Sequence, residues 1–261
     1  AQIKVKLTQK NFSGISPVPY EGEYDGNAHG ITLTGVPSGA TVKYGTSANS
    51  CTKDSLTYTD FTNGAQIVFY KVSQSGYADA SGSAWVNITK RPLTVTGITA
   101  KDKVYDGNTN VVLDYSAVTL GGVLENDTLT VTATGTLESA GVGEQKVTIS
   151  DLTLGGASAA NYVLAESGNQ SETTATITAK EVNVTIIPNG GTYGSVVAAA
   201  AKLTGAVDGD NVPVTLTYTG NGYNDTAVPV NAGSYTVTAS IANSNYTLTG
   251  KTTANFVIAP K

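Results

Sequence analysis

The feature that most constrains this chain is an internal repetition of a turn sequence. Tyr105-Asp-Gly-Asn has an earlier copy that begins at Tyr24, and Tyr193-Gly194 is a shortened third copy. Asp and Asn can bond to their own backbone, glycine accepts a positive φ, and a tyrosine ring can cover the edge of a core. We expect Tyr24 and Tyr105 to be buried at the ends of their domains, with Gly26 and Gly107 in turns. A turn is favoured over a catalytic role for the aspartates.

The repetition also sets a domain length. Each copy is followed by an alternating strand pattern that stops at a lysine. These lysines are Lys90, Lys180 and Lys261, which stand 90 and 81 residues apart. The spacing is close to the ~100 residues of an immunoglobulin-like sandwich and exceeds the ~20–50 residues of a solenoid repeat. The sequence predicts three tandem domains, residues 1–91, 92–180 and 181–261.

The composition favours strands. Charged residues make up 13% of the chain, about half the ordinary share, so Thr, Ser, Asn and Gly must supply the polar surface. Short alternating segments, beginning with residues 3–7, are separated by glycine-rich turns, a pattern typical of sandwiches. We predict an all-β chain of three immunoglobulin-like β-sandwich domains, with at most one short helix. The residues at helical spacing are Val196, Ala199, Ala200 and Leu203, with Ser195 as the N-cap and Gly205 beyond the end.

Several stretches resemble known domains. Residues 103–109, 122–129, 141–147 and 154–164 look like the YDG domain of bacterial adhesins. The last predicted domain, with Gly233-Ser-Tyr-Thr-Val and Asn245-Tyr-Thr-Leu, is similar to the related MBG domain. The first looks like a diverged relative, with Gly76-Tyr77 in place of Asn-Tyr. The resemblance implies immunoglobulin-like sandwiches in tandem arrays on bacterial cell surfaces, and it implies neither an enzyme nor known binding residues.

Few residues suggest a reactive site. Cys51 is the only cysteine and His29 the only histidine, so the chain has no internal disulfide, no zinc-binding set and no evident base for the thiol. Glu138 and Glu144 could meet across a hairpin as a glycosidase pair, but a sandwich offers no obvious cleft for them. Trp85 is expected to fill a core or a domain junction, with a sugar-stacking platform as the alternative.

Two acidic clusters leave a metal site open as an alternative. Glu21, Glu23 and Asp25 form one cluster, and Asp208 with Asp210 forms the other. Calcium between domains would suit such oxygen ligands, although neither cluster has the spacing of an EF-hand. Solvated turns are the expectation. We therefore predict no catalytic residues, no metal ligands and no cofactor, and the ligand-binding residues stay unassigned.

The function is expected to be structural or adhesive. The net charge is −5 with no basic patch, which argues against nucleic-acid binding. The longest apolar run is far too short to cross a membrane. We expect a monomeric stalk or adhesin segment, cut from a longer extracellular protein of the bacterial cell surface. It is expected to be extended, because the links at Arg91-Pro92 and Lys180-Glu181 are short. Its partner is an unknown host or matrix protein or glycan. The alternatives are a carbohydrate- or protein-binding module that uses exposed aromatics, and accessory domains of an extracellular enzyme.

Overall fold

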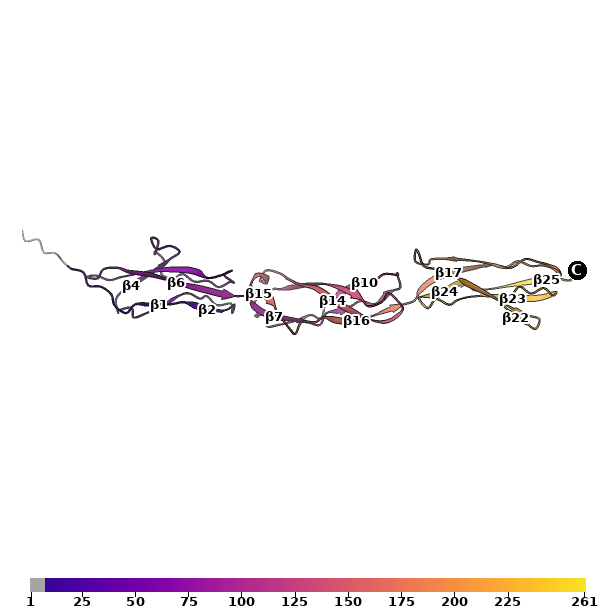
Figure 1. The fold of residues 1–261 in the computed structure, drawn as a ribbon, viewed down its shortest axis with the longest axis horizontal. Helices are drawn as coiled ribbons and strands as arrows, with labels where there is room; N and C mark the ends of the chain where they lie inside the picture. The colour runs from indigo at the N-terminus through magenta and orange to yellow at the C-terminus, as the bar shows by residue number, and fades with distance from the viewer. Residues whose placement is uncertain (1–7) are drawn as a thin grey trace, which may run out of the picture. The chain divides into compact units, whose positions relative to one another are not determined.

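The computed structural model describes residues 8–261, and its regular secondary structure is almost entirely strands (Figure 1). It has twenty-five strands and one 3-10 helix, Ala159–Asn161, in this part of the chain. The predicted all-β class is confirmed. The strand predicted at residues 3–7 lies outside the described residues.

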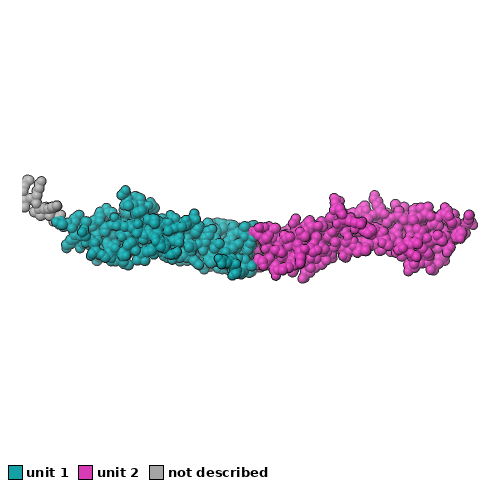
Figure 2. Space-filling model, in the orientation of Figure 1, with its two compact units in different colours: residues 1–96, 118–132, 152–169 teal, residues 97–117, 133–151, 170–261 magenta. Residues whose placement is uncertain are grey.

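The chain divides into two compact units (Figure 2). Unit 1 comprises residues 1–96, 118–132 and 152–169, and unit 2 comprises residues 97–117, 133–151 and 170–261. The division passes through the predicted middle domain, so the three-domain boundaries stay a prediction. Each unit contains one of the two predicted domain boundaries together with the segments on both sides of it.

In unit 1, a four-stranded sheet has the order β2-β6-β5-β4, and β1 pairs with β3. The strands are β1 (Ser16–Val18), β2 (Tyr20–Glu23), β3 (Thr32–Thr34), β4 (Thr41–Gly45), β5 (Gln66–Ser73) and β6 (Ala80–Thr89). Alternate residues of β5 and β6, including Val68, Val72, Val86 and Ile88, are fully buried. This period of two is what a sheet with one face on the core requires.

Unit 1 continues with β7 (Arg91–Thr96), which lies between β12 (Thr119–Gly121) and β15 (Tyr162–Leu164). The pairing of β7 with β15 is parallel and aligns Arg91 with Tyr162. Leu93 and Val95 of β7 are buried. The chain thus passes from β6 to β7 across a single residue, Lys90.

A five-stranded sheet has the order β10-β13-β14-β16-β9, and β8 pairs with β11. The strands are β8 (Thr99–Ala100), β9 (Lys103–Val104), β10 (Asn110–Val111), β11 (Leu113–Asp114), β13 (Thr130–Leu137), β14 (Gly143–Gly155) and β16 (Glu172–Thr178). Strands β13 and β14 contribute residues to both units. The parallel pairing of β16 with β9 brings Thr178 opposite Val104, directly before Tyr105.

The remainder of unit 2 contains a three-stranded sheet, β20-β17-β24, and a six-stranded sheet, β19-β18-β25-β23-β21-β22. The strands are β17 (Lys180–Ile187), β18 (Gly191–Thr192), β19 (Ser195–Val196), β20 (Ala200–Thr204), β21 (Val214–Gly220), β22 (Tyr223–Asp225), β23 (Gly233–Ile241), β24 (Tyr246–Lys251) and β25 (Thr253–Ala259). One core cluster joins both sheets and includes Val184, Tyr218, Val237, Phe256 and Ile258.

The predicted helix near residues 196–203 is wrong. Two strands lie there instead, β19 (Ser195–Val196) and β20 (Ala200–Thr204), and β20 pairs antiparallel with β17 from Asn183 to Ile187. Ala201 and Leu203 pack against the core cluster, while Ala200, Lys202 and Thr204 are exposed. The alternation therefore has a period of two, and pairing with β17 outweighs the helical preference of alanine.

Candidate functional site: two tyrosine–aspartate junctions

The most elaborate polar cluster of unit 1, which we call the first junction, is centred on Asp127. The Tyr24 hydroxyl, from the first predicted domain, donates to Asp127 Oδ1 at 3.1 Å. Tyr162 donates to Asp127 Oδ2 at 2.5 Å, and Ser158 donates to Oδ1 at 2.9 Å. The rings of Tyr24 and Tyr162 meet edge to face, with centroids 5.6 Å apart. We call the three predicted domains, residues 1–91, 92–180 and 181–261, the first, middle and last segments. One carboxylate thus joins side chains of the first and middle segments, which meet at Arg91.

Unit 2 contains a second junction of the same design, centred on Asp210. Tyr105, from the middle predicted domain, donates to Asp210 Oδ2 at 2.8 Å. Tyr246 donates to the same oxygen at 2.5 Å. The two rings again meet edge to face, with centroids 5.4 Å apart. The repeated turn of the sequence therefore contributes its tyrosine to a repeated contact.

Local structure explains how the tyrosines reach these positions. The amide of Tyr24 donates to Thr89 O and the amide of Tyr105 donates to Thr178 O, both at 2.9 Å. Each tyrosine is thereby tied to the last strand of its own segment. The rings are 5% and 7% exposed. The prediction that both rings are buried is confirmed.

The aspartates of the repeated sequence shape the turn. Asp25 Oδ1 accepts the amide of Asn27 at 2.9 Å, and Asp106 Oδ1 accepts the amide of Asn108 at 3.1 Å. This is the local side-chain-to-backbone bond that favours a turn over a strand. Lys103 also pairs with Asp106 at 2.6 Å. The predicted turn role of these aspartates is confirmed.

The glycines of the turn are required for two reasons. Gly26 and Gly107 have φ of +78° and +80°, which other residues rarely adopt. A Cβ on Gly26 would lie 3.3 Å from Leu124 Cδ1, and a Cβ on Gly107 would lie 3.1 Å from Val207 Cγ1. Both apolar contacts are with the segment that follows. The glycine therefore lets the turn approach its neighbour closely.

A matching turn presents each acceptor carboxylate. The Asp127 amide donates to Leu124 O and the Asp210 amide donates to Val207 O, both at 3.1 Å. The amides of Leu124 and Val207 in turn donate to the hydroxyl oxygens of the tyrosines that follow, at 3.0 Å each. Tyr162 and Tyr246 thus accept one bond from this turn and donate another to its aspartate. This arrangement holds the carboxylate in place.

Asparagines that precede these tyrosines add a second link. Asn161 accepts the amide of Phe61 at 2.8 Å and donates to Asp60 at 2.9 Å. In the second junction, Asn245 accepts the amide of Val142 at 3.0 Å. Each asparagine therefore forms hydrogen bonds with the segment that precedes its own in the chain.

The first junction has further contacts that involve the boundary residues. Arg91 donates through Nε to Gly122 O at 2.7 Å and through Nη1 to Tyr24 O at 3.4 Å. The Lys90 ammonium lies 5.0 Å from the centroid of the Phe61 ring, within reach of a cation–π contact. These residues fix the link between β6 and β7 to both of the segments that it joins.

The electrostatics favour a stable contact between an ionised aspartate and neutral tyrosines. Burial opposes ionisation of Asp127, but the hydroxyls of Tyr162, Ser158 and Tyr24 together lower its pKa. Hydrogen bonds from Tyr246 and Tyr105 lower the pKa of Asp210. Burial and the bond to Asp127 raise the pKa of Tyr162 to about 12. At neutral pH every donor therefore carries its proton and every acceptor its charge.

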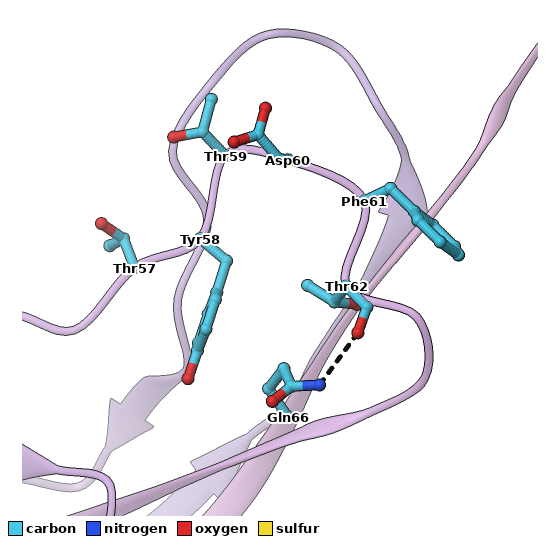
Figure 3. Close-up of a pocket in the computed structure, with 7 residues that line it drawn as sticks. All are labelled: Thr57, Tyr58, Thr59, Asp60, Phe61, Thr62 and Gln66. Atoms are coloured by element: carbon cyan, nitrogen blue, oxygen red, sulfur yellow. Dashed lines mark hydrogen bonds between the residues drawn. The ribbon is translucent and has the colours of Figure 1, made fainter. Parts of the chain in front are cut away.

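A hollow of about 490 Å³ lies beside the first junction (Figure 3). Its lining runs from Thr57 to Thr62 and includes Gln66, whose Nε2 donates to Thr62 O at 2.9 Å (Figure 3). Asp60 and Phe61, which line it, also bind Asn161. The loop that forms this hollow therefore also contributes to the junction.

The acidic clusters do not gather as metal ligands. Residues 8–261 contain no group of three or more His, Cys, Asp or Glu side chains placed to hold a metal ion. Asp25 instead pairs with His29 at 2.8 Å, and Asp210 accepts two tyrosine hydroxyls. Asp208, Glu21 and Glu23 are exposed.

The other candidates lie apart from the junctions. Trp85 is half-buried and stands opposite Ile67 on β5, whereas Val86 and Ile88 face the core. The expectation that Trp85 fills a core or a junction is therefore wrong. Glu138 and Glu144 are both exposed, and Cys51 is a half-buried free thiol. Across residues 8–261, no helix is long and apolar enough to span a membrane.

Comparison with protein families identifies two parts of the chain. Residues 89–175 match the family model of the YDG domain, and residues 192–261 match that of the MBG domain. The resemblance noted in the sequence is confirmed for these segments. The tyrosine of the second junction, Tyr105, lies in the first match, and its partners Asp210 and Tyr246 lie in the second. No curated protein matches the chain.

Several solved structures show a low similarity to this chain. Drosophila N-cadherin EC1–3 has a TM-score of 0.33 and 10% identity, covering 97% of this chain and 98% of its own. Mouse cadherin-23 EC22–24 gives 0.30 and 8%, covering 95% and 99%. Titin domains I67–I69 give 0.24 and 9%, covering 95% and 100%. Similarities this low carry no conclusion about function.

Proposed function

We propose that this chain is a non-catalytic structural and adhesive module of a bacterial cell-surface or secreted protein, acting as an extended stalk or adhesin segment. The observation that carries the proposal is the repeated junction. The same set of tyrosine and aspartate contacts links the first segment to the middle one and the middle segment to the last one. A chain under selection for stiffness needs such contacts where one sandwich meets the next, because short linkers alone leave freedom to bend.

The contacts of one junction oppose bending. A hydrogen bond to a charged group is shorter and stronger than one between neutral groups, and an edge-to-face aromatic pair adds about 0.5–1.5 kcal/mol. Tyr105 makes both contacts, with Asp210 and Tyr246. A bend that separates these groups loses both at once.

The family matches support the remainder of the proposal. YDG and MBG domains resemble repeats of bacterial adhesins, so we place the protein outside the cell, on the bacterial surface, as a monomer without a cofactor. Its partner is a host or matrix protein or a glycan, bound by the whole protein to which the segment belongs. The stalk holds that binding activity away from the cell.

Small-angle X-ray scattering tests the stalk. We expect a radius of gyration well above the ~18 Å of a compact globule of this length. A double variant, Tyr24→Phe with Tyr105→Phe, keeps both rings but removes their hydroxyl bonds to Asp127 and Asp210. It is expected to broaden the distance distribution. A measured radius near ~18 Å for the native chain contradicts the proposal.

The matched control is Tyr235→Phe. Tyr235 is buried, and its hydroxyl donates to Asn231 O within the last segment, away from both junctions. This variant makes the same chemical change and should scatter like the native chain. Equal broadening in the control and the double variant would assign the effect to general loosening rather than to the junctions.

A second candidate function is ligand binding through the outer face of β5 and β6. Ile67 is 47% exposed and pairs with Trp85, so an apolar patch stands on that face. Trp85 is the only tryptophan, and its fluorescence therefore reports on this patch alone. Titration with soluble oligosaccharides should shift the emission of the native chain if the patch binds glycans, and a flat titration removes that candidate.

A further inference from the structure

The third copy of the turn has the same backbone position as the other two. The Tyr193 amide donates to Ala259 O at 2.9 Å, as Tyr24 does to Thr89 and Tyr105 to Thr178. In all three cases the acceptor lies at the end of the segment's last strand, β6, β16 or β25. Tyr193 therefore corresponds to the tyrosines of the two junctions.

Tyr193 differs from them in exposure. Its side chain is 52% exposed, against 5% for Tyr24 and 7% for Tyr105. Gly194, which follows it, has φ of +86°, and a Cβ there would meet no atom within 4 Å. Gly26 and Gly107 stand two residues after their tyrosines, and a Cβ on either would lie 3.3 or 3.1 Å from the next segment. The turn at Tyr193 therefore shares the backbone hydrogen bond of the two junctions, but its tyrosine side chain is exposed.

A neighbouring loop also matches. Gly143 pairs with Ile177 and Gly233 pairs with Ile258, so the loops before these glycines correspond. The first loop contributes the Val142 amide to Asn245 in the second junction. The second loop carries Val230, which is 61% exposed. By this register Ala232 corresponds to Val142, and Val230 lies two residues before it in the same loop.

We propose that Tyr193 is the donor half of a third junction, and that its partner is a sandwich domain with the acceptor set of Asp210, Asn245 and Tyr246. The proposal rests on the stalk function and names the partner for this surface. Tyr193 would donate its hydroxyl to the aspartate of that domain and pack its ring against the tyrosine. The third turn lacks the aspartate of Tyr-Asp-Gly, so its only side-chain contribution is the tyrosine.

The first segment of a second copy of this chain is not that partner. It has the same turn, in which the Ala40 amide donates to Pro37 O at 3.2 Å, but alanine stands where Asp127 and Asp210 stand. Tyr77 corresponds to Tyr246, since Lys10 bridges to it as Lys180 pairs with Tyr246. Gly76 precedes Tyr77 in place of asparagine. Both side chains that bind a preceding segment are missing.

An extended chain tests the assignment. Lys261 follows Ala259 at the spacing at which Lys180 follows Thr178, so a second copy of residues 181–261 can be joined directly after Lys261 in register. The control carries Asp210→Ala and Asn245→Gly in the appended copy only. The first segment already tolerates alanine and glycine at these positions. Reaction with tetranitromethane, located on each tyrosine by mass spectrometry, measures the exposure of Tyr193.

We expect Tyr193 to react about tenfold more slowly in the extended chain, the protection that a junction closed for nine-tenths of the time provides. In the native chain and in the control it should react readily. Unchanged reactivity of Tyr193 in the extended chain overturns the proposal, and equal protection in the control overturns the assignment of the acceptor set. The reactivity of Tyr24 and Tyr105 towards tetranitromethane tests the stalk function separately, because these two tyrosines belong only to the two junctions already present.

Discussion

The hydroxyl of Tyr105 and that of Tyr246 donate to the same oxygen of Asp210, at 2.8 and 2.5 Å. Tyr246 belongs to the same segment as the aspartate, whereas Tyr105 comes from the segment before it. A side chain from each segment therefore depends on one carboxylate.

Replacing Asp210 with alanine should lower the free energy of unfolding by more than its control substitution does, because two hydroxyls lose a charged acceptor. Urea unfolding followed by circular dichroism measures the change. Asp208→Ala, two residues away and exposed, is the matched control and should change stability by less than ~0.5 kcal/mol. Equal effects of the two substitutions would show that the junction does not stabilise the fold.

Tyr105→Ala should cost about 3–5 kcal/mol, as expected for a buried aromatic side chain. Tyr193→Ala removes an equivalent but exposed tyrosine and should cost less than ~0.5 kcal/mol. Thermal melts of the two variants, run beside the native chain, make the comparison. A Tyr105→Ala melt that coincides with the native one would mean that the ring contributes nothing to stability.

Gly107→Ala should destabilise the protein by more than Gly209→Ala. Both glycines have a left-handed backbone, at +80° and +89°, which costs an alanine about 1–2 kcal/mol. Only at Gly107 does the new Cβ also approach Val207, at 3.1 Å. Repeating Gly107→Ala in a Val207→Ala background should remove the excess. If Gly107→Ala is still more destabilising than Gly209→Ala in the Val207→Ala background, the difference does not come from the contact with Val207.

The stability of the junctions should depend on pH at both extremes. The pKa values of Asp127 and Asp210 are lowered in the folded state, so their contribution is present above the unfolded value of about 3.9 and is lost as pH falls through the folded one. The pKa of Tyr162 is raised to about 12. Its contribution is present below the unfolded value of about 10 and is lost as pH rises through 12.

Urea unfolding across the pH range should therefore give a plateau between about pH 5 and 9 with a decline on each side. The double variant Asp127→Asn with Asp210→Asn removes both lowered pKa values and should flatten the acid decline. An acid decline as steep as the native one would assign the effect to other carboxylates, such as Asp25, whose pKa is lowered to about 2 by His29 and Asn27.

The sequence predicted one half of each junction. The turn chemistry of Tyr-Asp-Gly-Asn is local, so the burial of Tyr105 and the φ of Gly107 follow from the residues themselves. The acceptors were missed, and Asp210 was considered only as part of a solvated or calcium-binding turn. Tyr105 and Asp210 lie 105 residues apart, and no local pattern specifies which faces of two sandwiches meet. A shared spacing was available as a signal: Asp127 and Asp210 each follow a turn glycine by five residues, Gly122 and Gly205.

The failed helix has a different cause. The spacing of Val196, Ala199 and Leu203 fits a helix and an irregular strand pair equally well, and short apolar segments are ambiguous in this way. The partner strand β17 decides between them. Trp85 illustrates the same limit, because which face of a strand meets the core depends on the register of the whole sheet.

The bond between Tyr246 and Asp210 lies entirely within the last segment, and it fixes the carboxylate whether or not Tyr105 is present. A preorganised acceptor of this kind needs little rearrangement to receive its donor. The acceptor of each junction is thus held in place by a tyrosine of its own segment, Tyr162 for Asp127 and Tyr246 for Asp210.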